Sequence, residues 1–326
     1  MASDVSAMRR ALICGVSGQD GAYLAKTLLE SGCNVIGTAR SDGVPAALAQ
    51  LGLVGRVRVI VLDISDASNV LAAIAELRPT EIYNLAGQSS VGQSFHHPVE
   101  TFEGIALGTL NLLEAIRQVE PATRLFNAGS GEMFGDTGGD PASEATPIAP
   151  RSPYAIAKAA AYWSVVNYRE AYRLYACTGI LFNHDSPLRS ERFVTRKIVS
   201  AAVRIAHGSG ERLRLGNLDV SRDWGWAPEY VDAMQQMLAQ DTPGDLVLAT
   251  GTTISLMDFT DAAFSAVGLD WRDHVEFDAA LARPTDIAVV RADPSQAAHR
   301  LNWRAQTRGL DVARRMVEAE VAALPR

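Results

Sequence analysis

One stretch near the N-terminus most constrains the fold. Residues 15–21 read Gly-Val-Ser-Gly-Gln-Asp-Gly, and this GxxGxxG spacing lies between an apolar run at 11–14 and a helical period at 21–31. A second apolar run follows at 34–38. This order predicts a βαβ unit, in which the glycines permit a tight turn and bring a bound diphosphate to the helix N-terminus. A strand-to-helix turn without a ligand is the alternative.

The same alternation continues along the chain. Further strands are predicted at 57–62, 82–85, 125–128 and 176–182, with helices at 69–76, 102–119 and 153–172 between them. Strands that alternate with helices predict an α/β fold, here a Rossmann-like doubly wound parallel sheet covered on both faces.

After Asn183 the alternation weakens, which predicts a smaller, mixed α/β substrate-binding lobe. A helix at 224–240 and a strand at 245–250 are expected to return to the main sheet. We therefore assign residues 1–183, with about 218–252 returning to them, to a dinucleotide-binding domain. Residues 184–217 and 253–326 are assigned to the smaller lobe.

Composition excludes several classes of function. The net charge of −7 and pI near 5.4 argue against a general nucleic-acid binder, because phosphate neutralisation needs a basic face. Neither a membrane span nor the apolar core of a signal peptide is apparent, so we expect a cytoplasmic protein without a membrane partner. The three cysteines, Cys14, Cys33 and Cys177, show no CxxC spacing, so neither disulfides nor a metal site is expected.

Two residues at predicted strand ends bear on the cofactor. Arg40 follows the second strand, where an acidic residue would favour a free ribose 2′-hydroxyl and an arginine can pair with a 2′-phosphate. NADP is therefore favoured over NAD, with a solvated surface arginine as the alternative. Asp63 ends the third strand and is placed to meet the adenine, although a helix N-cap at Asp63 or Ser65 explains it equally well.

The tightest chemical signal is the pair Tyr154 and Lys158. Four residues on a helix place both side chains on one face, about one turn apart. A nearby ammonium lowers the pKa of a phenol, and together with a cationic nicotinamide this would let Tyr154 act as a base. YxxxK alone is common as a surface pair, but its position downstream of the glycine-rich loop favours catalysis.

A third group of candidates follows the strand at 125–128. Ser130 is placed to hydrogen-bond the substrate hydroxyl that Tyr154 deprotonates, at the sheet edge where open α/β proteins bind ligands. Glu132 supplies a second acid/base group, which plain alcohol oxidation does not need but elimination of water does. A helix-start carboxylate without a chemical role is the alternative for Glu132.

At this point the sequence resembles the extended short-chain dehydrogenase/reductase group, and within it the GDP-mannose 4,6-dehydratase family, over nearly its whole length. The segments that carry the resemblance are GVSGQDGAYLAK at 15–26, YNLAGQSSVGQSF at 83–95, GSGEMFG at 129–135, PRSPYAIAK at 150–158, GILFNHDSPLR at 179–189, FVTRKI at 193–198, LGNLDVSRDWGW at 215–226 and LNW at 301–303. Several of these are specific to nucleotide-sugar dehydratases.

The resemblance implies a redox-neutral reaction that converts GDP-mannose to GDP-4-keto-6-deoxy-mannose. Tyr154, assisted by Lys158 and Ser130, would take the O4 proton while hydride leaves C4 for NADP. The new ketone acidifies C5, so that Glu132 would remove the C5 proton and protonate the departing 6-hydroxyl before hydride returns to C6.

The resemblance also implies the binding residues. Cofactor contacts are expected from Gly15, Gly18, Gln19, Asp20, Gly21, Arg40, Asp63, Ile64, Leu85, Ala86, Gln88, Tyr154 and Lys158. Contacts to the GDP-sugar are expected from Ser89, Asn183, Arg189, Lys197, Leu215, Gly216, Arg222 and Arg283. Arginine suits this role because its fork binds phosphate bidentately, although surface solvation or ion pairing with Glu191, Asp219 or Asp286 remains an alternative for the basic residues.

The chain departs from the family at several positions. Relatives usually have threonine and serine where this chain has Ser130 and Gly131, and a glutamate where it has Asp185. Residues 41–47 lack the basic residues with which relatives reach a neighbouring subunit's cofactor, which bears on both the tetramer and the NADP preference. A homodimer or homotetramer is expected, with the apolar side of the helix at 153–172 as a candidate interface.

Two other functions remain open. A dehydratase, reductase or epimerase on another nucleotide sugar, such as a GDP-heptose, would share the glycine loop, Tyr154 and Lys158, but a reductase or epimerase would not depend on Glu132. A non-catalytic NADP-binding regulator would keep the fold without turnover.

Overall fold

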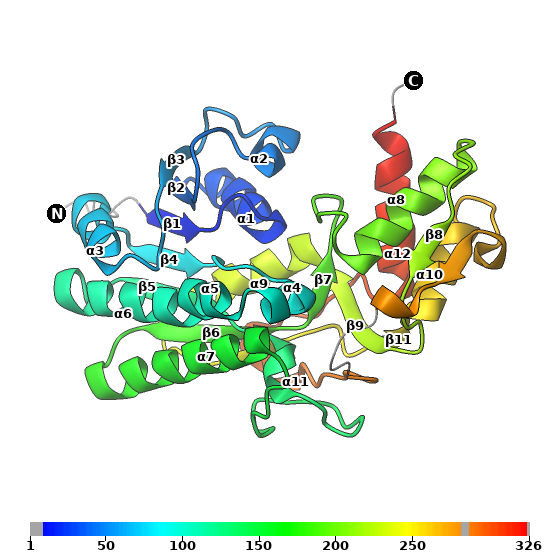
Figure 1. Cartoon of the computed structure of the whole chain (residues 1–326). Coiled ribbons are helices and arrows are strands. Elements are labelled where there is room, and N and C mark those ends of the chain that lie inside the picture. Colours follow the sequence, from blue (N-terminus) through cyan, green and yellow to red (C-terminus); the bar gives the residue numbers. More distant parts are fainter. Residues whose placement is uncertain (1–8, 282–286, 325–326) are drawn as a thin grey trace.

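The computed structural model describes residues 9–281 and 287–324. Its centre is a seven-stranded sheet with the strand order β10-β6-β5-β4-β1-β2-β3, in which every neighbouring pair is parallel (Figure 1). The strands are β1 Arg10–Cys14, β2 Asn34–Ala39, β3 Arg58–Val61, β4 Glu81–Asn84, β5 Arg124–Ala128, β6 Ala176–Leu181 and β10 Leu246–Leu248.

Helices bury both faces of this sheet. Ala11 and Ile13 of β1 belong to the apolar core that includes Leu24 of α1, whereas Leu12 and Cys14 belong to a second core on the other face. One face is covered by α1 Gln19–Glu30, α2 Ala46–Gln50 and α9 Ala227–Ala239, and the other by α3 Ala67–Leu77, α6 Gly108–Val119 and α7 Pro153–Tyr172. Successive strand residues point to opposite faces, so both sets of side chains are buried, which confirms the predicted doubly wound fold.

The helix at 153–172 begins and ends as predicted. The helix expected at 102–119 begins earlier, because α5 Pro98–Phe102 and the π-helical turn η1 Glu103–Leu107 lead into α6. The prediction of a helix from residue 224 was wrong for its first three residues. They end β9, Ser221–Trp226, whose backbone pairs with two other strands, and α9 begins only at Ala227.

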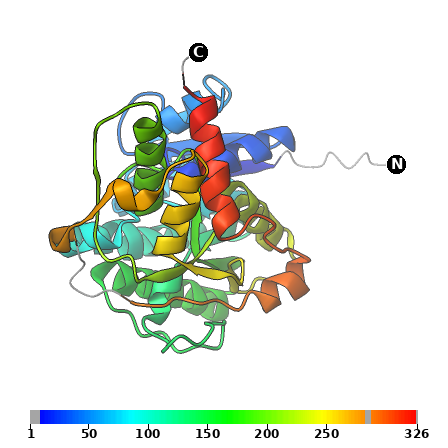
Figure 2. The same cartoon turned by 90° about the vertical axis from the view of Figure 1, so that its right-hand side faces the viewer.

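A second lobe lies beyond the carboxyl ends of the main strands, at the right of Figure 1. In it β7 Asn183–Asp185, β9 and β11 Thr253–Ser255 form a three-stranded sheet, and β8 Leu213–Leu215 pairs with β12 Val275–Phe277. The helices α8 Val194–Ala206, α10 Leu256–Ser265 and α12 Leu310–Ala322 enclose its core, and Figure 2 shows α12 alongside α10. The strand β10, by contrast, pairs with β6 in the main sheet.

The remaining short elements connect these layers. They are α4 Val91–His96, α11 Ser295–Leu301, and the 3-10 turns η2 Gly131–Phe134, η3 Trp271–Asp273 and η4 Ala279–Leu281. No helix in the described part of the chain is both long and apolar enough to cross a membrane.

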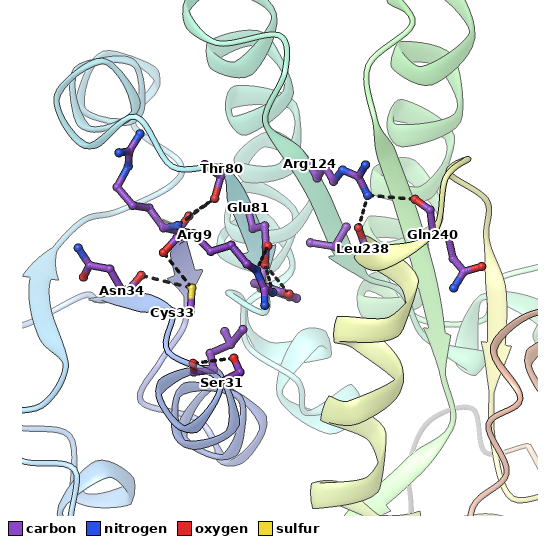
Figure 3. Close-up of polar contacts among 12 residues, drawn as sticks. Arg9, Ser31, Cys33, Asn34, Thr80, Glu81, Arg124, Leu238 and Gln240 are labelled. Carbon is purple, nitrogen blue, oxygen red and sulfur yellow. Dashed lines mark hydrogen bonds and ion pairs between the residues drawn. The ribbon is translucent and has the colours of Figure 1, made fainter. Parts of the chain in front are cut away.

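The amino edge of the main sheet is closed by polar contacts within the protein (Figure 3). Arg9 donates from Nε and Nη2 to the two carboxylate oxygens of Glu81, at 2.6 and 3.0 Å. Arg124 donates from Nη1 to the carbonyl oxygens of Leu238 and Gln240, at 2.6 and 3.0 Å, and so closes the C-terminal end of α9. Arg9, Glu81 and Arg124 therefore stabilise the amino edge of the sheet. Ligands of open α/β sheets bind at the opposite, carboxyl edge.

Candidate active site

A cleft of about 1200 Å³ lies between the carboxyl edge of the sheet and the second lobe. The neighbouring strands β1 and β4 form its floor. From β1 the chain continues to β2 on one side of this point, and from β4 it continues to β5 on the other side, so the strand order reverses here. Such a switch point leaves a crevice between loops that run in opposite directions, which is where open α/β sheets bind ligands.

The glycine-rich loop forms one end of the cleft, and its shape depends on two glycines. Gly15 has φ +87°, and a Cβ there would lie 2.9 Å from the carbonyl oxygen of Leu85. A Cβ at Gly21 would lie 2.5 Å from the carbonyl oxygen of Gly15, so only glycine lets α1 start this close to β1. Gly18 caps α1 without a side-chain hydrogen bond. The glycines thus leave the backbone at the start of α1 open to close approach, and its first amides fit a diphosphate.

Arg40 lies at the same end, at the carboxyl end of β2. Its side chain is exposed, and Nη1 lies 3.4 Å from Oε1 of Glu100 in α5. Asp63 accepts hydrogen bonds from the amide and hydroxyl of Ser65, at 2.9 and 2.8 Å, and the amide is the main cause that lowers the pKa of Asp63. The cap of α3 is Asp66, which accepts from the amide of Asn69, so the alternative of a cap at Asp63 or Ser65 was wrong.

The other end of the cleft holds Ser130, Tyr154 and Lys158, all buried and at most 8% exposed. Ser152 caps α7 by accepting from the amide of Ala155, and Pro153 occupies the first turn, which fixes where the helix begins and hence where Tyr154 lies. The Lys158 ammonium donates to the carbonyl oxygen of Ala128 at 2.6 Å and lies 5.8 Å from the centre of the Tyr154 ring.

Burial dominates the ionisation of this pair. It raises the pKa of Tyr154 to about 12, against a hydrogen bond with Ser130 that lowers it, and the carboxylate of Glu132 raises it further. Burial likewise lowers the pKa of Lys158 to about 8. Burial therefore opposes ionisation of both the phenol and the amine, and the lowering of the phenol's pKa by Lys158 and a bound nicotinamide stays a prediction.

Glu132 is half-buried on the turn η2, where its amide donates to the Ser130 hydroxyl at 3.2 Å. The neighbouring Gly131 packs on Phe182, and a Cβ at this glycine would lie 2.9 Å from the phenyl ring. This contact gives a physical reason for the absence of a second hydroxyl beside Ser130, because a serine at 131 would have to displace the ring.

The second lobe supplies polar side chains to the opposite wall. Arg189 pairs with Asp185 at 3.0 Å and lies 3.6 Å above the ring of Phe193. Lys197 donates to the carbonyl oxygen of Arg214 at 2.6 Å, and the buried Arg222 donates to that of Ser221 at 2.9 Å. Glu191, which was an alternative ion-pair partner for these basic residues, pairs with Arg204 at 3.3 Å.

The structure brings the sequence candidates together. Every residue that we named as a catalytic, cofactor or sugar contact lines this one cleft, except Arg283, which lies outside the described residues. Asn183 is exposed in the cleft, and Gln88 is held in place by hydrogen bonds with Thr101 and Ser90. Leu215 at the end of β8 and Gly216 just after it border the cleft. Among the described residues, no three His, Cys, Asp or Glu side chains gather as metal ligands.

Sequence reasoning missed two cleft residues. Glu100 faces Arg40 from a segment 60 positions away, and nothing in the local pattern relates the two. His184 is buried in β7, where both ring nitrogens make hydrogen bonds. Its place between Asn183 and Asp185, in a segment already singled out, was a signal that could have been followed.

Comparison with known proteins agrees with this geometry. A family model described as GDP-mannose 4,6 dehydratase matches residues 12–316. The chain is 44% identical to GDP-mannose 4,6 dehydratase 1 of Arabidopsis thaliana, over 98% of this chain and 92% of that protein. It is 43% identical to the GDP-mannose 4,6-dehydratase of Sinorhizobium fredii, over 96% of this chain and 97% of that protein.

Solved structures share the fold. The UDP-glucose 4-epimerase of Thermus thermophilus, solved in complex with NAD, superposes with a TM-score of 0.84 at 26% identity, over 97% of this chain and 100% of that chain. The dTDP-glucose 4,6-dehydratase of Bacillus anthracis superposes with a TM-score of 0.85 at 17% identity, over 97% of both chains.

Proposed function

The chain belongs to the GDP-mannose 4,6-dehydratase family, and from this membership we propose that it converts GDP-mannose to GDP-4-keto-6-deoxy-mannose. The observation that carries the proposal is the single cleft that joins a glycine-rich loop to Ser130, Glu132, Tyr154 and Lys158. An oxidoreductase of alcohols needs only Ser130, Tyr154 and Lys158. Glu132 adds the acid/base group that elimination of water requires.

We propose NADP as the cofactor. The glycine-rich loop and the start of α1 fit the diphosphate of any nicotinamide dinucleotide, and Arg40 lies at the strand end where the adenosine ribose is bound in this fold. A guanidinium there favours a 2′-phosphate over a hydroxyl. Asp63, Ile64, Leu85, Ala86 and Gln88 line the cleft between these two points and would surround the adenosine and the nicotinamide.

The chemistry divides among four side chains. When bound, the nicotinamide supplies an acceptor for hydride from C4 and a donor of hydride to C6. The Lys158 ammonium stabilises the phenolate form of Tyr154. This phenolate takes the proton from O4 and becomes a neutral phenol, while Ser130 holds the O4 oxygen by a hydrogen bond. The C4 ketone acidifies C5. Glu132 then removes the C5 proton and transfers it to the departing 6-hydroxyl, so that water leaves. As hydride reaches C6, C5 regains one proton, which balances the proton that Tyr154 took from O4.

The second lobe would hold the nucleotide sugar. All seven residues named for this role line the cleft. We expect Asn183 and Ser89 to contact the sugar, and Arg189, Lys197, Arg222, Leu215 and Gly216 to contact the diphosphate and nucleotide. The guanidinium groups provide planar donor pairs and Lys197 a compact charge. In this proposal residues 1–183 and about 218–252 bind the dinucleotide, and residues 184–217 and 253–326 bind the nucleotide sugar.

We propose that the protein is a homodimer at least. Ile156 and Trp163 of α7 are 49% and 56% exposed, and Val99 and Phe102 of the neighbouring α5 are 68% and 45% exposed. Exposed apolar side chains gathered on one pair of helices are typical of an interface between identical subunits.

The test is incubation of the purified protein with GDP-mannose and a catalytic amount of NADP. Loss of one water from the sugar, measured by mass, without accumulation of reduced nicotinamide supports the proposal. Consumption of NADPH with a reduced sugar as product would instead identify a reductase. Retention of NADP without any change in GDP-mannose would redirect the search to other GDP-sugars, among them a GDP-heptose.

A further inference from the structure

A buried ion pair links the cofactor end of the cleft to the second lobe. Nε2 of His184 in β7 lies 2.9 Å from Oδ2 of Asp20, the one acidic residue in the glycine-rich loop. Nδ1 of the same ring lies 2.7 Å from the carbonyl oxygen of Phe182. The His184 residue is 8% exposed, so neither contact is a surface accident.

The two contacts determine the protonation of the ring. A carbonyl oxygen and a carboxylate oxygen are both acceptors, so both nitrogens of His184 must carry hydrogen, and the ring is an imidazolium. Burial alone would lower the pKa of His184, but the carboxylate of Asp20 and the carbonyl of Phe182 outweigh it, and the net pKa is raised. The pKa of Asp20 is in turn lowered, because His184, together with Arg189 and Gln19, outweighs the opposing effect of burial.

The surrounding groups keep the pair in place. The imidazole ring stacks on Tyr230 of α9, with ring centres 4.4 Å apart and planes 16° from parallel. Gln19 donates from its amide nitrogen to the carbonyl oxygen of His184 at 2.9 Å and accepts from the hydroxyl of Ser186 at 2.8 Å. The loop is thus joined by two hydrogen bonds to His184 of β7 and by a third to Ser186, just after this strand.

The charge of Asp20 affects the binding of a diphosphate because of where this residue lies. It lies in the first turn of α1 and borders the cleft, so an uncompensated carboxylate would repel a diphosphate at the helix N-terminus. Two other cations lie near Asp20, namely Arg189 and Lys158, but Arg189 is paired with Asp185 and the hydrogen bond of Lys158 goes to the carbonyl of Ala128. His184 is the cation that contacts the carboxylate directly. Tyr230 stays neutral because burial raises its pKa well above the ordinary value.

We propose that His184 is a positioning residue for the dinucleotide, which acts as a permanent imidazolium that neutralises Asp20 and fixes the glycine-rich loop to β7. The inference rests on the proposed dinucleotide site at the start of α1. It assigns His184 a role through Asp20 and not through contact with the reacting atoms.

The experiment is a direct measurement of NADP affinity by calorimetry, with purified protein freed of bound nucleotide and without sugar. H184Q removes the cation and should weaken NADP binding roughly tenfold. D20N in the same chain should restore most of that affinity, because a neutral amide at this position no longer repels the diphosphate. H207Q is the matched control, since His207 also donates to a backbone carbonyl, that of Val203 at 2.8 Å, but does not line the cleft.

The NADP affinity of the double variant distinguishes a role of His184 in charge compensation from a purely structural role. If His184 and Asp20 merely brace the fold, the double variant will bind NADP no better than H184Q, and the inference is wrong. Equal affinity of H184Q and the wild type would also overturn it. Failure of the wild type itself to bind NADP would instead refute the proposed cofactor site.

A second measurement does not depend on the folding of any histidine variant. Nitrogen chemical shifts of the wild-type imidazoles should show one ring that remains doubly protonated at pH 8, and this signal should become that of a neutral ring in D20N. A neutral His184 in the wild type at pH 8 would contradict the proposal.

Discussion

Arg40 and Glu100 face each other at the mouth of the cleft, with Nη1 3.4 Å from Oε1 and both side chains largely exposed. The residue proposed to select the 2′-phosphate therefore already has an anionic partner. A bound 2′-phosphate must compete with this carboxylate for the same guanidinium, so Glu100 is expected to weaken the preference that Arg40 creates.

Glu100→Gln should strengthen NADP binding roughly two- to fivefold and leave NAD binding unchanged, because an exposed ion pair contributes little. Arg40→Ala should remove the difference between the two cofactors. Glu76→Gln is the control, since Glu76 pairs with Arg58 at 3.5 Å on the surface away from the cleft. Calorimetric titrations with each cofactor decide the matter, and a gain in NAD affinity equal to the gain in NADP affinity would contradict it.

Variants of Glu132 and of Tyr154 should block different steps of the reaction. Glu132→Gln should lower turnover roughly 10²- to 10⁴-fold, yet it should still oxidise C4, so that reduced nicotinamide accumulates in an amount close to that of the enzyme. Tyr154→Phe should lower turnover by a similar factor without any reduced nicotinamide, because the O4 proton is never taken. Stopped-flow absorbance of reduced nicotinamide distinguishes the two variants. If neither variant forms reduced nicotinamide, the roles assigned to Glu132 and Tyr154 are wrong.

The alkaline side of the pH profile should report Lys158. Its folded pKa is lowered to about 8, mainly by burial, so the ammonium that stabilises the phenolate is lost as pH rises through about 8. The turnover number of the wild type should therefore fall above this pH. Lys158→Arg keeps a cation at all these pH values and should retain a small activity that no longer falls there. A profile of Lys158→Arg that declines with the same midpoint would assign the titration to another group.

The face of α5 and α7 that exposes Trp163 and Phe102 is expected to bury these side chains in a dimer. Trp163→Glu should shift the protein toward monomer at micromolar concentration in sedimentation experiments, because a carboxylate at an apolar interface is costly to desolvate. The control Leu71→Glu changes a partly exposed residue of α3 and should not alter the assembly. A monomeric wild type would contradict the proposed dimer directly.

The sequence predicted best what depends on neighbouring residues. The helix from Pro153 to Tyr172 was predicted to the residue, because a serine cap, a proline in the first turn and a long helical period all agree locally. The strands of the main sheet were found for the same reason, since each is a short apolar run between turns. Tyr154 and Lys158 followed from their spacing on one helix.

The features that the sequence did not predict depend on contacts between residues far apart in the chain. The sequence pattern predicts a helix from residue 224, but residues 224–226 are extended because their strand pairs with β7 and β11. Glu100 meets Arg40, and His184 meets Asp20, across 60 and 164 positions, so no periodicity links them. The pKa of Tyr154 depends on burial, which no local pattern gives.

Gly131 offers a test of how tightly the catalytic turn is packed. A Cβ at this position would lie 2.9 Å from two atoms of the Phe182 ring and 3.1 Å from a third, and both residues are buried. Gly131→Ala should therefore lower the free energy of unfolding by roughly 1–3 kcal/mol, as overpacking of a core does, and should reduce turnover by displacing Ser130 and Glu132.

The measurement is chemical denaturation alongside turnover, with Gly210→Ala as the matched control. A Cβ at Gly210 would meet no atom within 4 Å, and its φ is not positive, so this variant should differ from the wild type by less than about 0.5 kcal/mol. Phe182→Leu combined with Gly131→Ala should recover part of the stability, because the smaller side chain makes room for the methyl group. If Gly131→Ala alone is as stable as Gly210→Ala, the ring moves freely, and packing against Phe182 does not explain the glycine beside Ser130.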